Sequence, residues 1–174
     1  MQKQIKILLT LLTALILAVS CAKNNVTNPT KVIPGTDNAN FSKLKNSWIN
    51  DYGIGYELYN ITEDSVESAG SYNNSPESVG YKISIEEITW NSDNASGIIY
   101  GKYIVDNNNN NNLGKWYAIY FEGLTDSTVS ICGASKQLEN GTYDASAESL
   151  EDAKTKFTKN NGYFDWPSIC TAVQ

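Results

Sequence analysis

The feature that most limits the possible folds is a series of short runs rich in aromatic and β-branched residues, separated by turn-forming asparagine, glycine and proline. Runs over residues 98–105 and 116–121 are the clearest, and weaker runs cover residues 64–72 and 128–134. Such residues favour strands, and short strands in close succession favour antiparallel hairpins. The sequence therefore predicts a mainly β fold, in which an antiparallel meander closes into a small β-barrel.

An alternating segment precedes these runs. Tyr52, Ile54, Tyr56 and Leu58 occupy every second position, with polar residues or glycine between them. A period of two is typical of a half-buried strand. We therefore expect a half-buried strand that Trp48 opens and that continues to residue 58, with these four side chains on its inner face.

A change of parity marks the next strand. Tyr81, Ile83 and Ile85 share one face, whereas Ile88 lies on the opposite parity. One extra residue in a strand restores the alternation, because a β-bulge shifts the following side chains to the other face. The pattern predicts a bulge near residues 86–87.

An uninterrupted asparagine run covers residues 107–112. Asparagine suits turns, so the run is expected at a hairpin tip, where insertions are tolerated. It leaves the strand register open. One register places Tyr103 opposite Trp116, and a register shifted by one residue places it opposite Tyr117 and turns the other strand face inward.

A C-terminal amphipathic helix is predicted over residues 147–158, with Ser146 as its N-cap. Leu150, Ala153 and Phe157 form a narrow apolar stripe at helical spacing. The helix is therefore expected to lie on the sheet by one edge.

Residues 1–20 have the parts of a secretory signal peptide: Lys3 and Lys6, an apolar run over residues 7–19, and small residues at the end. The apolar run is about 13 residues long, whereas a membrane-spanning helix needs roughly 20. We interpret it as a cleaved signal.

Ala18-Val19-Ser20-Cys21 resembles the lipobox of bacterial lipoproteins, with Ala18 where leucine is commoner. The resemblance implies that Cys21 carries lipid and anchors the protein to a membrane, facing the periplasm or the cell surface. Several acyl chains hold a protein on a membrane almost permanently. The alternative is an ordinary signal peptide with a cysteine near its cleavage site.

The remaining chain divides into a tether and one domain. Residues 21–40 are rich in Lys, Asn, Thr, Pro and Gly without apolar periodicity, which predicts a flexible tether. Residues 41–174 are long enough for a single β-rich domain with its own core.

The charged residues limit the chemistry. The chain contains no arginine and no histidine, and it carries 19 acidic residues against 13 lysines. An acidic surface without arginine disfavours nucleic-acid binding. The lack of histidine excludes Ser-His-Asp and Cys-His catalysis and the commonest zinc sites. We expect no cofactor and no metal.

If Cys21 carries lipid, Cys132 and Cys170 are the two remaining cysteines. Exported proteins meet an oxidising compartment, so these two are predicted to form a disulfide. The bond would tie the aromatic C-terminal tail to a strand. The alternative is two unpaired thiols.

Residues 48–57, 95–100 and 114–121, followed by Leu124-Thr125, resemble in order and spacing a group of small lipoproteins of spirochaetal bacteria. The resemblance implies a compact antiparallel domain similar in outline to the lipocalins, and it brings no activity with it. The Gly-x-Trp signature of lipocalins is absent, because Asn46-Ser47 precedes Trp48.

The function expected from these features is non-enzymatic binding of a protein or of a small apolar or sugar ligand at the cell envelope. The alternative is an envelope structural protein or an enzyme inhibitor that uses exposed loops. A carboxylate hydrolase would need two acids facing each other about 5 Å apart, which the scattered positions do not favour. The acidic candidates considered are Glu86, Glu87, Asp106, Asp126, Asp144 and Asp165.

The anchor can be tested by metabolic labelling. Growth with radiolabelled palmitate is expected to label the wild-type protein and not the Cys21→Ala variant, because the lipid is attached through that thiol. Labelling of the variant would exclude Cys21 as the attachment site.

Overall fold

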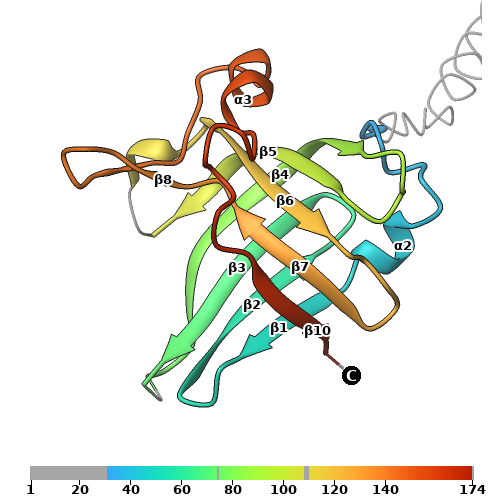
Figure 1. Cartoon of the computed structure of the whole chain (residues 1–174), viewed down its shortest axis with the longest axis horizontal. Helices are drawn as coiled ribbons and strands as arrows, with labels where there is room; N and C mark the ends of the chain where they lie inside the picture. Colours follow the sequence, from blue (N-terminus) through green and yellow to red (C-terminus); the bar gives the residue numbers. More distant parts are fainter. Residues whose placement is uncertain (1–30, 74, 108–109, 174) are drawn as a thin grey trace, which may run out of the picture. The chain divides into compact units, whose positions relative to one another are not determined.

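Within the described residues, 31–73, 75–107 and 110–173, the computed structural model contains eight antiparallel strands that close into a barrel (Figure 1). Each strand pairs with the next along the chain, and β10 closes the barrel between β7 and β1. The predicted β-barrel is therefore confirmed. Its strands are β1 Ser47–Asp51, β2 Gly55–Ile61, β3 Ser65–Tyr72, β4 Ser78–Trp90, β5 Gly97–Asp106, β6 Trp116–Glu122, β7 Thr128–Gly133 and β10 Ser168–Ala172.

The other elements are short. In the described part of the chain, no helix is long and apolar enough to span a membrane. The predicted signal peptide and Cys21 lie outside the described residues. The short elements are α2 Phe41–Leu44, the 3-10 turn η1 Asn110–Asn112, the hairpin of β8 Lys136–Gln137 and β9 Tyr143–Asp144, and α3 Leu150–Lys156.

The first predicted strand is wrong in its bounds and in its inner face. Residues 52–54 form the turn between β1 and β2, where Gly53 has a positive φ of 84° and its N–H donates to Asp51. Tyr52 and Ile54 are exposed on this turn. The residues of β2 that face inward have the other parity, Glu57, Tyr59 and Ile61.

The bulge in β4 is confirmed. Ile85 pairs with Gly101 and Glu87 pairs with Tyr100, so Glu86 is the extra residue. Because of this insertion, the residues on both sides of it face the core. Ile83, Ile85 and Ile88 are all buried.

Both registers considered for the hairpin of β5 and β6 are wrong. Tyr103 lies opposite Lys115, since its N–H donates to the Lys115 carbonyl and its carbonyl accepts from Gly114. The register that pairs Tyr103 with Tyr117 has the correct inner face but is displaced by two residues. After the turn η1 and Gly114, which has a positive φ of 79°, the returning chain meets β5 one residue earlier than the first register predicts and two residues earlier than the second.

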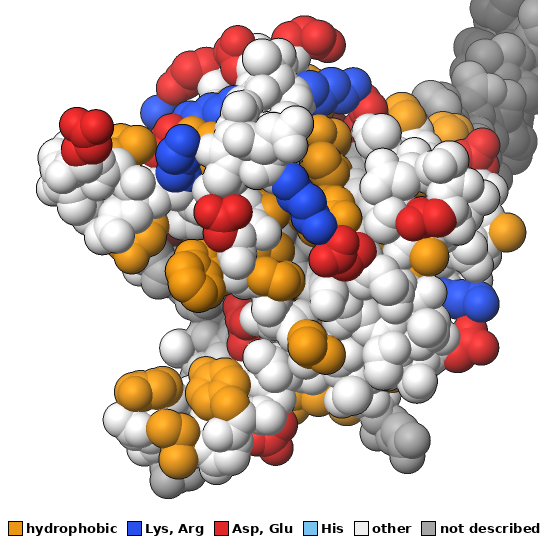
Figure 2. All heavy atoms as spheres, in the orientation of Figure 1, with side chains coloured by type: hydrophobic (Ala, Val, Ile, Leu, Met, Phe, Trp, Pro, Cys, Tyr) orange, Lys and Arg blue, Asp and Glu red, His pale blue; other side chains and the backbone are white. Residues whose placement is uncertain are grey.

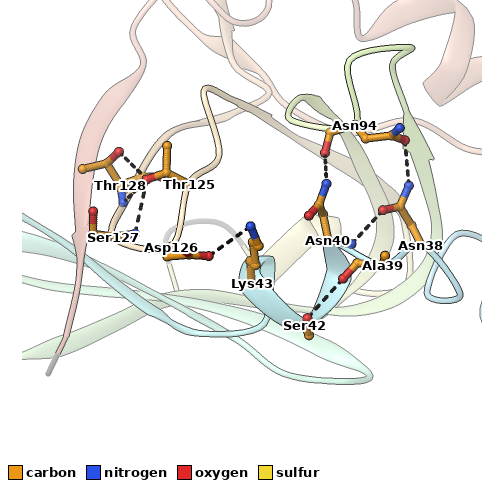
Figure 3. A network of polar contacts seen from close by, with 10 residues as sticks. All are labelled: Asn38, Ala39, Asn40, Ser42, Lys43, Asn94, Thr125, Asp126, Ser127 and Thr128. Carbon is orange, nitrogen blue, oxygen red and sulfur yellow. Dashed lines mark hydrogen bonds and ion pairs between the residues drawn. The ribbon is translucent and has the colours of Figure 1, made fainter.

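The N-terminal segment closes one end of the barrel. Asn38 and Asn40 donate their side-chain amides to Asn94 in the β4–β5 turn, each at 2.9 Å (Figure 3). Lys43 of α2 forms an ion pair of 3.0 Å with Asp126 in the β6–β7 turn. Three segments that are distant in sequence are therefore joined at this end, which we call the closed end.

The folded unit begins earlier than the expected boundary at residue 41, since it covers residues 32–174. Ile33 is buried in the core. The Pro34 carbonyl accepts from Ile88, and the Gly35 carbonyl accepts from the Trp90 indole at 2.8 Å. The described end of the expected tether is thus part of the domain.

The helix α3 is shorter than predicted, and its N-cap is Ser149 instead of Ser146. The Ser149 hydroxyl accepts from the Asp152 N–H at 3.1 Å. Ala147 cannot join the helix because it exchanges two backbone hydrogen bonds with Trp116 at the start of β6. The predicted apolar stripe is confirmed, with Ala153 and Phe157 buried in the core.

The predicted disulfide is not formed: Cys132 and Cys170 are free and buried. Cys170 lies opposite Val129 and faces the interior, whereas Cys132 lies opposite Tyr120 and faces outward. Side chains on opposite faces of a sheet point apart, which prevents a disulfide between adjacent strands.

Thiol counting tests this correction. In the Cys21→Ala variant, we expect two reactive thiols per chain after unfolding without a reductant, and slow reaction in the native state. Burial, with a contribution from the charge of Glu57, raises the pKa of the Cys170 thiol to about 12, so little thiolate is present at neutral pH. If the unfolded chain has no reactive thiol, Cys132 and Cys170 form the disulfide predicted from the sequence.

Candidate ligand-binding cup

The interior of the barrel is polar at the end opposite the closed end. This open end is formed by the β1–β2, β3–β4, β5–β6 and β7–β10 connections (Figure 1). Polar and aromatic side chains meet inside the barrel at this end, because side chains alternate between the two faces of each strand. The paired residues that place them there are Glu57 with Gly70, Tyr59 with Ser68, and Ile131 with Ser168. By contrast, isoleucine, valine, phenylalanine and Trp48 fill the interior nearer the closed end.

A cavity of about 240 Å³ lies at this end, lined by inward-facing side chains, by the outward-facing Cys132 at the end of β7 and by the tail that precedes β10. We call it the cup. Its wall comes from β2, β4, β6, β7 and the start of β10, together with the tail that precedes β10. The cup is lined by Glu57, Tyr59, Tyr81, Tyr117, Cys132, Gly133, Ser135, Tyr163, Asp165, Trp166 and Ser168.

A second hollow of about 350 Å³ shares Glu57 with the cup. It lies against β2, β3 and the start of β4, and Tyr52, Tyr56 and Tyr72 contribute to its wall. Figure 2 shows the surface hollowed between the projecting hairpin at the lower left and the body of the molecule, with hydrophobic side chains on both sides. The open end is therefore concave and rich in aromatic residues.

Packed tyrosine rings support the cup. The rings of Tyr81 and Tyr117 meet edge to face with centroids 5.1 Å apart, and Tyr103 lies 4.7 Å from Tyr117. Phe157 of α3 continues the contact toward Tyr163, at 5.2 Å. Edge-to-face aromatic pairs have preferred geometries, so this cluster holds the phenol groups in place.

Gly133 allows two of these phenols to approach the strand β7. A Cβ atom at this position would lie 2.3 Å from the Tyr117 hydroxyl and 3.1 Å from that of Tyr81. Any other residue would displace the hydroxyls, so glycine is required here by the tyrosines of the cup.

Glu57 is the central acid of the open end. Its carboxylate accepts a hydrogen bond from the Tyr59 hydroxyl at 2.5 Å and another from the Ser168 hydroxyl. The first bond lies within β2, and the bond from Ser168 joins β2 to β10 across the inside of β1, which lies between them. The carboxylate is thereby oriented at the wall that the two hollows share.

The Tyr81 hydroxyl is buried and makes no hydrogen bond within the described part of the chain. The Tyr117 and Ser68 hydroxyls are close enough to influence its pKa, which burial raises well above the usual value. The group is therefore a neutral phenol that can donate and accept. Burying a hydroxyl without a partner destabilises a protein by about 1–3 kcal/mol, so this phenol lowers the stability of the barrel.

Burial also raises the pKa of Tyr59 and Tyr117 well above the usual value. Tyr59, Tyr81 and Tyr117, three of the four tyrosines of the cup, are thus protonated throughout the physiological pH range. They supply hydrogen-bond donors and aromatic faces, and none is poised to act as a base.

Most of the acids considered from the sequence have structural partners. Glu87 pairs with Lys154 at 2.8 Å, Asp126 pairs with Lys43, and Asp144 pairs with Lys156 at 2.6 Å. Glu86 accepts from the Ser84 hydroxyl, and Asp106 is buried at the end of β5. Of the set, Asp165 alone lines the cup.

Glu57 was not among the candidates, because the alternation over residues 52–58 placed it on the outer face. The Asp51-Tyr52-Gly53 turn signal splits that run and reverses the parity. Within the described ranges, no group of three or more His, Cys, Asp or Glu side chains is arranged to hold a metal ion.

No family model, no curated protein and no solved structure matches this chain.

Two hydroxyl deletions test the cup. Tyr59→Phe is expected to lower the free energy of unfolding by about 1 kcal/mol or more, because Glu57 loses a hydrogen bond. Tyr81→Phe removes a buried hydroxyl that has no partner, so it is expected to leave that free energy unchanged or to raise it by about 1 kcal/mol. Urea denaturation of the full-length protein measures both. An equal loss in the two variants would show that the Tyr81 hydroxyl is satisfied.

Proposed function

We propose that the protein is a non-enzymatic binding protein of the bacterial cell envelope, anchored by lipid on Cys21, whose cup binds a small ligand. The observation that carries the proposal is the buried Tyr81 hydroxyl without a partner beside a cavity of about 240 Å³. Ligand pockets combine apolar and aromatic walls with a few oriented polar groups. The cup has both.

The position of the N-terminal segment supports an anchored receptor. Residues 32–46 lie at the closed end, where Lys43 and Lys45 pair with Asp126 and Glu63 on two turns. The cup opens at the other end of the barrel. The chain that leads to Cys21 therefore leaves the domain from the closed end and not from the cup.

The lining favours a compact ligand with a flat or apolar face and polar groups at its edge. Tyrosine and tryptophan rings offer surfaces for stacking, and Ser135, Ser168 and Glu57 offer hydrogen-bond partners. A sugar ring or a substituted aromatic ring has this chemistry.

A second candidate function is binding of a protein through the exposed aromatic and apolar side chains around the open end, which we call the rim. Tyr52, Ile54, Tyr72 and Trp166 are exposed at the open end, with Trp166 at 88%. Exposed aromatic residues of this kind are common in protein interfaces. The rim would serve an inhibitor or a structural protein without use of the cup.

Fluorescence titration with three probes separates these candidates: tyrosol, phenyl β-D-glucoside and tyramine. Full-length protein in detergent is expected to bind at least one of them with a change in tryptophan emission, because Trp166 lies at the mouth. Ser135→Phe, which places a ring in the cup, is expected to weaken binding by at least about tenfold, or about 1.4 kcal/mol.

Ser127→Phe is the matched control, since Ser127 is exposed on the β6–β7 turn at the closed end. It is expected to bind like the wild type. If no probe binds the wild type more tightly than it binds Ser135→Phe, the cup is not a binding site and the rim is the better candidate.

A further inference from the structure

We propose that the cup selects a small organic cation, an amine or a quaternary ammonium group carried on an apolar or aromatic body. The inference rests on the proposed ligand-binding function and specifies the charge of the ligand.

The charged residues that line the two hollows have one sign. Glu57 and Asp165 line the cup, and Glu57 also lines the second hollow. Among the described residues that line the two hollows, none is a lysine. A ligand that enters therefore meets two carboxylates and no cation.

The nearest lysines along the tail are engaged elsewhere. Lys156 binds Asp144 and Lys159 binds Glu122, at 2.6 and 2.7 Å. The Lys136 ammonium donates to the Asn161 carbonyl and lies over the outer ring of Tyr163. Within the described ranges, no lysine forms an ion pair with Glu57 or Asp165, so their charge is available to a ligand.

The charge of Glu57 acts within the barrel. Burial is the main cause of the raised pKa of Tyr59, Tyr81 and Cys170, and the negative charge of Glu57 raises all three further. The negative charge of Glu57 therefore reaches groups that lie inside the barrel. Fields of one sign in a low-dielectric cleft attract ligands of the opposite sign.

The aromatic wall strengthens this preference. A cation over the face of a tryptophan or tyrosine ring is attracted by the ring's electron density, most strongly where water is excluded. Five aromatic residues line the cup together with the two carboxylates: Tyr59, Tyr81, Tyr117, Tyr163 and Trp166. This combination favours an ammonium group over a neutral hydroxyl group of the same size.

The Tyr81 hydroxyl is a separate observation that points to a ligand. It is buried at the cavity and makes no hydrogen bond within the described chain. As a neutral phenol, it can accept an N–H from an ammonium group while Glu57 balances the charge. A ligand amine would thus supply a partner for this buried hydroxyl.

A matched pair of probes tests the charge. Tyramine and tyrosol share one ring and chain, and they differ by an ammonium group in place of a hydroxyl group. Calorimetric titration of the full-length protein at low salt is expected to show tyramine binding at least about tenfold more tightly than tyrosol. The ratio is expected to fall as salt rises, because ions screen the carboxylates.

Glu57→Gln removes the charge and keeps one acceptor oxygen, while its NH₂ group can donate to the second of the Tyr59 and Ser168 hydroxyls. It is expected to bring the two affinities within about twofold of each other while tyrosol binding stays near the wild-type value. Glu63→Gln, an exposed acid at the closed end, is the matched control and is expected to keep the wild-type ratio. If Glu57→Gln unfolds, Asp165→Asn replaces it, because Asp165 is exposed at the mouth.

Equal binding of the two probes by the wild type would overturn the cation inference and leave ligand binding by the cup intact. A preference for tyramine that persists in both Glu57→Gln and Asp165→Asn would also overturn it, because the preference would then arise elsewhere. Absence of binding by every probe would instead contradict the proposed function itself.

Discussion

The pairing of β10 with both β7 and β1 is the constraint on which the rest of the structure depends. Without this five-residue strand, β1 and β7 would be open edges with unpaired backbone groups. The closure also fixes the site. It carries Ser168 to Glu57 and draws the preceding tail, with Asp165 and Trp166, across the mouth. Barrel stability and cup geometry therefore come from the same segment.

The two halves of the interior differ in how they are stabilised. Near the closed end, large apolar side chains such as Trp48 and Phe121 are fully buried and supply most of the hydrophobic free energy. Near the open end, the inward-facing positions of the strands are occupied by tyrosines and Glu57, and these side chains leave a cavity between them. Polar groups in such places lower stability unless they have partners, which is the pattern expected where a site is kept for binding.

Features that depend on local chemistry could be predicted from the sequence. The barrel class follows from the β-prone runs, and the bulge at Glu86 follows from a parity change that no regular strand can accommodate. Features that depend on pairing between distant segments could not. The inner face of β2 was reversed because a turn at Gly53 divides the alternating run, and the disulfide failed because strand parity sets Cys132 and Cys170 on opposite faces. The cup joins residues from five strands and a tail, so no single stretch of sequence reveals it.

Both described ends of the domain lie at the closed end, where the Val173 N–H donates to the Ser47 carbonyl beside the N-terminal segment. The mouth is therefore built from loops alone, and none of them leads to a chain terminus. Loops tolerate changes of length and sequence better than the strands that carry them. The asparagine-rich β5–β6 connection and the β8–β9 hairpin can thus diverge among descendants of this chain, which would change what the protein recognises while its attachment and its core remain the same.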